Sequence, residues 1–337
     1  MRRSLILLCL LASYTTAPGT SPRTAETFGD WSAPVNVVSL NTAYNDMYAV
    51  LSKDELTVYF TSDRPDPTSV GRDDLWFATR ESVDAPWGPA QNMGEPINSL
   101  FADSLPMLSY DEHVMFFHST RPGGCGLTGT GDIWITRRHN KRSQEWEPPA
   151  NLGCVLNTAS TEIAPAFFED PENEHVTLFY GSNRPGSQDF DVYASAIRED
   201  GYFGPGVLVP EFSSPKRDTR IFIRKDGLEA FITSNRDNGQ GLIDIWTSTR
   251  ETLSDPWPPT PIDVPSPVNS TCDDGSPSLS RDGTTLYFFS SRTAGLQCGT
   301  RDIWYTTRVK IDPENTAQGM VARLWKGMLG RMGGTAQ

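Results

Sequence analysis

Five arginines recur along the chain in one sequence context, and they are the residues best suited to bind or orient a charged group. Each stands two positions after a serine and is followed by an aspartate, an aliphatic residue and a large aromatic residue, as in TSDRPDPTSVGRDDLW at 61–76. A guanidinium offers a planar fork of N–H donors that fits carboxylates. The spacings of 57, 63, 52 and 56 residues indicate a repeat architecture. The arginines are Arg64, Arg121, Arg184, Arg236 and Arg292.

An acidic residue precedes each of these arginines by 18 residues in four repeats and by 22 in the third. Four of the acids stand five positions after an asparagine, and Ser213 replaces that asparagine in the fourth repeat. Folding such a segment into a hairpin brings acid and arginine to the same end. The pairs are either structural ion pairs or a set of carboxylates able to act as general acids and bases. The acids are Asp46, Asp103, Glu162, Asp218 and Asp274.

Other polar residues depart from the repeat or recur beside it. His118 directly precedes a Ser-x-Arg where three other copies have a small residue, so it is either a general acid or base or a satisfied polar residue at a strand end. The paired aspartates at 73–74 and at 189–191 would suit calcium, although paired aspartates are ordinary at turns, and we expect no other cofactor and no dedicated metal site. Aspartates that open the third strand of each repeat are expected to accept from the arginines or from loop amides. They are Asp74, Asp132, Asp191, Asp244 and Asp302.

The elements that position these residues are short strands. In the second repeat, the runs 104–109, 113–119, 132–138 and 146–153 are apolar or alternating and are separated by turn residues. Four antiparallel strands at this period are typical of a β-propeller blade. The fifth repeat lacks its outermost strand, while WSAPVNVV from Trp31 stands alone at the start. The sequence therefore predicts an all-β, five-bladed propeller of four-stranded blades, closed by an N-terminal outer strand that joins the C-terminal blade.

The repeat also resembles a known family. LSRDGTTLYFFSSR…DIWYTTR in the fifth copy and LSKDELTVYFTSDR…DDLWFATR in the first look like the TolB-like, WD-repeat-like propeller repeats of exported bacterial proteins. The resemblance covers roughly residues 28–308 and implies the fold but not a function. TolB itself has six blades and an additional N-terminal domain, and neither fits this chain.

Two disulfides are expected from the four cysteines outside the leader. Three pairings are open from the sequence alone. The predicted topology places all four cysteines in loops on one face, which favours Cys125–Cys154 and Cys272–Cys298.

The ends of the chain are expected to lie outside the propeller. Two arginines followed by an apolar run indicate a signal peptide at 1–17, which predicts export to the periplasm or the extracellular space. A flexible linker is expected at 18–27, the propeller at 28–308, and a tail with a short helix at 309–337. No other apolar stretch is long enough to span a membrane.

Charge and motifs bound the function. The formal net charge of −13 argues against nucleic acid as a partner. The chain lacks GxSxG, HExxH and the EF-hand loop. Two hypotheses remain: an exported binding scaffold whose Arg/Asp-lined face holds a carbohydrate or a protein, or a carbohydrate-active enzyme, a glycoside hydrolase or lyase, using the axial carboxylates.

Overall fold

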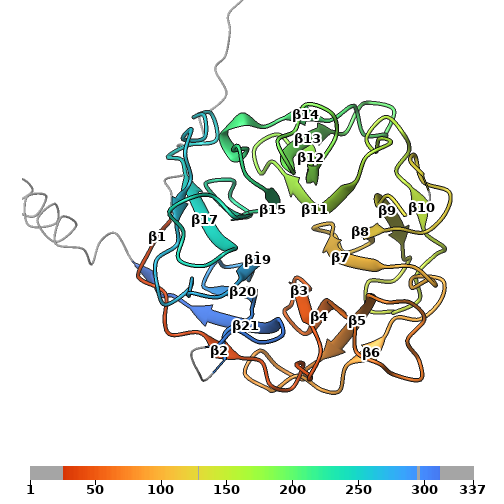
Figure 1. The fold of residues 1–337 in the computed structure, drawn as a ribbon, viewed down its shortest axis with the longest axis horizontal. Coiled ribbons are helices and arrows are strands. Elements are labelled where there is room, and N and C mark those ends of the chain that lie inside the picture. Colours follow the sequence, from red (N-terminus) through yellow and green to blue (C-terminus); the bar gives the residue numbers. More distant parts are fainter. Residues whose placement is uncertain (1–25, 128, 294–296, 312–337) are drawn as a thin grey trace, which may run out of the picture.

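Five small sheets surround one axis in the computed structural model of the protein, which describes residues 26–127, 129–293 and 297–311. Figure 1 looks along this axis, and the strands β3, β7, β11, β15 and β19 lie nearest to its centre. Each of these five sheets has four antiparallel strands, and the only helical element of the described residues is the 3-10 turn Pro210–Phe212. The predicted five-bladed β-propeller is confirmed.

Each blade runs outward from its innermost strand. The first blade contains β3 (Asp46–Leu51), β4 (Thr57–Ser62), β5 (Asp74–Thr79) and β6 (Gln91–Asn92). The second contains β7 (Asp103–Leu108), β8 (Val114–Ser119), β9 (Asp132–Arg137) and β10 (Ala150–Asn151). The third contains β11 (Glu162–Glu169), β12 (Val176–Ser182), β13 (Asp191–Ala196) and β14 (Val207–Leu208). The fourth contains β15 (Asp218–Ile223), β16 (Glu229–Ser234), β17 (Asp244–Thr249) and β18 (Ile262–Asp263). The fifth contains β19 (Asp274–Leu279), β20 (Thr285–Ser290), β21 (Asp302–Thr307) and β2 (Val35–Asn36).

The two ends of the described chain close the ring. β2 pairs antiparallel with β21, with Val35 opposite Tyr305, so the N-terminal segment supplies the outer strand of the fifth blade as predicted. A second ladder joins β1 (Thr27–Phe28) to β22 (Lys310–Ile311). This ladder extends the folded part slightly beyond the expected bounds of 28–308.

The outer strands are shorter than the sequence suggested. In blade 2, 146–153 was expected to form one strand, but only Ala150–Asn151 pairs with its neighbour. Pro148 and Pro149 stand directly before it, and proline has no N–H to give to a ladder. The tryptophan at the start of this segment packs differently: the guanidinium of Arg138 lies 4.4 Å from the ring centroid of Trp146.

That cation–π contact recurs around the ring. An arginine directly after the third strand stacks on the tryptophan of the outer segment in four blades, at 4.3–4.4 Å. The pairs are Arg80 with Trp87, Arg138 with Trp146, Arg250 with Trp257, and Arg308 with Trp31. Outer segments with little backbone pairing are thereby held to their sheets by side chains.

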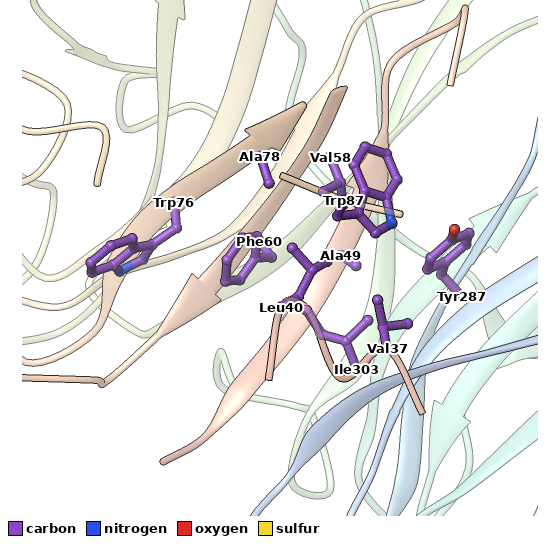
Figure 2. Close-up of a cluster of buried hydrophobic side chains, with 10 residues drawn as sticks. All are labelled: Val37, Leu40, Ala49, Val58, Phe60, Trp76, Ala78, Trp87, Tyr287 and Ile303. Carbon is purple, nitrogen blue, oxygen red and sulfur yellow. The ribbon is translucent and has the colours of Figure 1, made fainter. Parts of the chain in front are cut away.

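Apolar clusters fill the spaces between and within blades. Figure 2 shows the cluster at the closure, where Val37 and Leu40 from the N-terminal segment pack with Phe60 of blade 1 and with Tyr287 and Ile303 of blade 5. Burying these side chains stabilises the junction of first and last blade by the hydrophobic effect. The ring is therefore closed by side-chain packing as well as by strand pairing.

A β-bulge interrupts the pairing of every inner strand with its second strand. The third residue of the inner strand then has positive φ in four blades: Tyr48, Leu105, Ala164 and Ser276, with φ of 54–62°. Arg220 is the fourth blade's residue at this position. A β-bulge changes the direction in which a side chain points. These five residues therefore form a separate layer of side chains around the axis.

Parts of the expected boundaries lie outside the described residues. The predicted signal peptide at 1–17, most of the linker and nearly all of the C-terminal tail belong to this group. No helix within the described ranges is long and apolar enough to cross a membrane.

Candidate functional site

Each blade contains one buried ion pair between the first residue of its inner strand and the arginine that follows its second strand. We call this pair the blade lock. The closest N–O distances are 2.6 to 3.3 Å in blades 2 to 5, and the pair in blade 1 is equally direct. The pairs are Asp46–Arg64, Asp103–Arg121, Glu162–Arg184, Asp218–Arg236 and Asp274–Arg292.

The rest of each lock is also bonded. In blade 1, Oδ2 of Asp46 accepts from the backbone N–H and the hydroxyl of Thr42, at 2.6 and 2.8 Å, and a serine or threonine does the same in the other blades. Asn41 bonds both the N–H and the C=O of Ile303 in the preceding blade, at 2.8 Å each. The asparagine and the acid of the repeated motif therefore tie one blade to the next.

These contacts leave almost no surface for a ligand. All five lock acids have an exposed fraction of 0%, and the side chains of the five arginines are 10–15% exposed. Each arginine also donates to a carbonyl oxygen of the loop that enters its blade. The residues predicted as catalytic acids and as ligand-binding arginines thus contact one another and the backbone.

In blades 1 to 4 the aspartates that open the third strands accept from loop amides, one of the two partners expected for them, and Asp302 of blade 5 accepts from the side chain of Asn36. Asp74 accepts from the N–H groups of Val70 and Gly71 at 2.8 and 3.0 Å, and Asp132 accepts from Cys125 N–H at 2.6 Å. The carboxylate of Asp74, one of the expected calcium ligands, is therefore used by its own loop. Within the described ranges, no three His, Cys, Asp or Glu side chains are grouped to hold a metal ion.

His118 lies inside the protein and not among exposed carboxylates. Its Nδ1 is 3.1 Å from Ser104 Oγ, and its Nε2 is buried without a hydrogen-bond partner. Burial lowers the pKa of His118 to about 4, so the ring is neutral at physiological pH. A Cβ at Gly131 would stand 1.8 Å from Nε2, which makes glycine necessary beside it.

Both predicted disulfides are present. Cys125–Cys154 and Cys272–Cys298 have Cα–Cα distances of 5.4 and 5.6 Å. Each joins the loop between a second and third strand to a blade-to-blade connection. They hold loops on the face of the propeller at which the inner strands begin. We call this face the axial end.

At one position of the repeat, directly before each third strand, the side chain differs from blade to blade. The carbonyl oxygen of the residue before each third strand accepts from the N–H of the next blade's lock acid, for example Asp73 O from Asp103 N at 2.8 Å. Since this bond uses only the backbone, the side chain is free to vary. The residues at this position are Asp73, Gly131, Phe190, Ile243 and Arg301.

At the first of these positions, Asp73 lies near enough to Asp63 for the charge of Asp63 to act on it. Asp63 is half-buried, and both its oxygens accept from Asn45, from the backbone N–H and from Nδ2, at 2.8 Å each. Asp73 is half-buried too, and the pKa of its carboxyl is raised, first by burial and then by the negative charge of Asp63. The two carboxyls therefore differ in their environments: Asp63 is fixed by two hydrogen bonds, and Asp73 has a raised pKa.

Cations and one phenol surround this pair. Burial raises the pKa of the Tyr48 hydroxyl, and the charges of Arg301, Asp73, Arg220 and Arg217 all act on it. Arg301 forms an ion pair with Asp273 at 2.8 Å. This arrangement, one carboxyl with a raised pKa and a second carboxyl held by hydrogen bonds, is chemically suited to general acid and base catalysis.

From the sequence, Asp73 was proposed only as a calcium ligand, and Asp63, Tyr48 and Arg217 were not proposed as site residues. Their signal was their lack of repetition: Asp73 is the one aspartate at its position among the five blades. Such a difference is visible only after the repeats have been aligned residue by residue.

Comparisons with known proteins support the fold. No family model matches the chain, and no curated protein matches it either. Among solved structures, an α-L-arabinofuranosidase from Lactobacillus brevis superposes with a TM-score of 0.54 at 13% identity, over 84% of this chain and 96% of that one. A GH43_1 enzyme from Xanthomonas citri gives 0.53 at 14% identity, over 84% and 92%. A GH43 endo-arabinanase from Bacillus licheniformis gives 0.53 at 12%, over 81% and 97%.

These findings correct two sequence-based interpretations. The propeller repeat was compared with TolB-like proteins, but the structural neighbours are glycoside hydrolase propellers. The hypothesis of a non-enzymatic scaffold with an Arg/Asp-lined binding face is wrong: its arginines and acids are buried against each other, and the neighbouring structures favour the alternative hypothesis. What the chain shares with these enzymes, at this low identity, is the five-bladed fold.

Proposed function

We propose that the protein is an exported carbohydrate-active enzyme that cleaves glycosidic bonds at the axial end of the ring, in the periplasm or the extracellular space. The carboxyl pair Asp63 and Asp73 carries the proposal, because Asn45 donates to both oxygens of Asp63, while burial and the charge of Asp63 raise the pKa of Asp73. Acid and base work at one site requires such a difference. The two disulfides fit export into an oxidising compartment.

The roles follow from the environments. Asp73 donates its proton to the oxygen of the leaving sugar as the glycosidic C–O bond breaks. Asp63 accepts a proton from the attacking water, or from the sugar in a lyase reaction, and Asn45 holds its carboxylate in place. Asp73 then recovers its proton from solvent. The pattern of one acid and one base is that of glycoside hydrolysis in general.

The solved structures that share this fold also support a carbohydrate substrate. Three of the structures that share it are, by their titles, an arabinofuranosidase, a GH43_1 enzyme and an endo-arabinanase. Fold alone does not assign an activity, so the carboxyl pair has to be tested. The proposal gives the lock acids and His118 structural roles, because they are buried and bonded within the blades.

The test is turnover by variants of the pair. The mature protein is incubated with arabinan, arabino-oligosaccharides and a panel of other plant and bacterial polysaccharides, and new reducing ends or unsaturated products are measured. Asp73→Asn and Asp63→Asn should each lower kcat by about a hundredfold or more. Asp66→Asn, on the same loop but fully exposed, is the matched control and should leave turnover unchanged.

Two outcomes would contradict the proposal. One is turnover that survives in both variants of the pair at the level of the Asp66→Asn control. The other is that the protein forms no product from any polysaccharide of the panel, although thermal unfolding shows that it is folded.

A further inference from the structure

One cation is buried on the axis of the ring without a carboxylate. Arg220 is the third residue of the inner strand β15, and its exposed fraction is 1%. Its equivalents in the other blades are Tyr48, Leu105, Ala164 and Ser276, none of which is charged. The guanidinium is therefore a property of this chain's fourth blade and not of the repeat.

The hydrogen bonds of Arg220 leave donors unused. Nη2 donates to the carbonyl oxygen of Pro106 at 3.3 Å, which reaches from blade 4 to blade 2. Nε and Nη1 are buried and have no partner. Among the described residues, no Asp or Glu lies within ion-pair distance of Arg220. Every lock arginine, by contrast, has its acid.

An unpaired buried charge is costly. Removing a guanidinium from water costs several kcal/mol unless hydrogen bonds and an opposite charge compensate. Burial lowers the pKa of Arg220 to about 10, so the group still carries its charge at neutral pH. The fold thus maintains a cation, with donors unused, at a place where an apolar residue would pack at lower cost.

The surroundings favour an anion. The neighbouring inner strand presents Ser276, whose Oγ is buried and has no partner. The Tyr48 hydroxyl lies near Arg220, and burial raises the pKa of that hydroxyl, so it is uncharged at neutral pH. Arg220 itself does not line a cavity of about 90 Å³ that lies further along the inner strands, away from the axial end; Phe222, two residues after Arg220, does.

The lining of this cavity carries more positive than negative charge. Three cationic side chains contribute to it, Lys53, Lys225 and Arg281, and one acidic side chain, Glu112. This excess contrasts with the net charge of −13 for the whole chain. Cations around a low-dielectric cavity raise the local concentration of anions.

We propose that Arg220 is the receptor for one carboxylate-sized anion bound on the axis of the propeller, with the Ser276 hydroxyl as a second donor. The planar fork of an arginine fits a carboxylate. Two sources share this chemistry: the carboxylate of an acidic sugar, an identification that rests on the proposed function, and a small inorganic anion such as chloride. In the first case the substrate class is uronic-acid-containing oligosaccharides.

Thermal unfolding of the full mature protein distinguishes the sources. Sodium galacturonate, galactose and sodium chloride are titrated at matched ionic strength. Stabilisation by galacturonate but not by galactose or chloride is expected for a sugar carboxylate, and equal stabilisation by chloride and galacturonate for an inorganic anion. At a ligand concentration a hundred times Kd, the melting temperature should rise by roughly 5 °C or more.

Variants test whether the anion-dependent rise in melting temperature requires Arg220. Arg220→Met should abolish the rise, and Arg220→Lys should weaken it. Asp73→Asn should keep the rise in full, so loss of turnover and loss of anion binding remain separate results. The proposal is overturned if the wild-type protein shows no anion-dependent rise, or if Arg220→Met retains it. Should Arg220→Met not fold, the wild-type titrations and Arg220→Lys decide.

Discussion

Carboxyl groups at the axial end have two different roles, one in structure and one in the proposed chemistry. A lock acid such as Asp103 is fully buried, faces Arg121 at 2.6 Å and holds a loop, so its charge is used for structure. Asp63 and Asp73 are half-buried, and burial and the charge of Asp63 raise the pKa of Asp73. Partner and burial, not residue type, distinguish the two tasks.

The lock predicts a large stability loss from a small change. Asp103→Asn removes the negative charge while Arg121 stays buried, so the free energy of unfolding should fall by about 3 kcal/mol. Asp200→Asn is the control, because Asp200 pairs with Arg198 at 2.6 Å but both side chains are about half exposed. It should cost under about 1 kcal/mol. Urea unfolding of the two variants measures both values, and equal losses would refute the structural role of the lock.

Asp244 predicts a pH dependence. Burial raises its pKa to about 6, so the folded protein binds a proton there that the unfolded chain has already lost. Asp244 thereby contributes at most about 3 kcal/mol to the free energy of unfolding. The contribution is fully present below about pH 4 and is lost as the pH rises through about 6.

The check is a comparison of pH profiles. The fall in the free energy of unfolding from pH 5 to pH 7 should be smaller in Asp244→Asn than in the wild-type protein. Asp66→Asn, a change at an exposed side chain, should leave the fall as it is. A profile of Asp244→Asn that matches the wild type would show that Asp244 does not titrate in this range.

Strands and loops were largely predictable, and for physical reasons. Period-two alternation and turn residues indicated the inner three strands of each blade, and the lone WSAPVNVV segment indicated the closure. The outer strands were overestimated because packing of Trp146 on Arg138, and not backbone pairing, fixes them. The Asp63–Asp73 pair could not be predicted, because its members meet only through a loop whose course the sequence does not fix.

For the molecule as a whole, closure protects the strand edges. β21 pairs with β2 on one side, so no blade of the described chain leaves its third strand open. A chain that begins after Asn36 lacks β1 and β2 and exposes the edge of β21, which invites pairing with another chain. A chain that begins at Glu26 retains both strands and is the matched control.

The shortened chain should have a lower melting temperature and a larger mass in solution than the control. Thermal unfolding and size-exclusion chromatography with light scattering measure the two effects. If both chains have the same mass and melting temperature, strand pairing at the closure contributes nothing to the integrity of the ring.

The same closure sets an order in time. Blade 5 takes its outer strand from the first described residues and its inner three from the last, with Val35 opposite Tyr305. During synthesis the ring cannot be completed until nearly the whole chain has been made, because the two halves of one sheet are separated by about 270 residues. Splitting one blade between the two ends of the chain therefore keeps the ring incomplete until synthesis is nearly finished, which suits a protein that crosses a membrane before it folds.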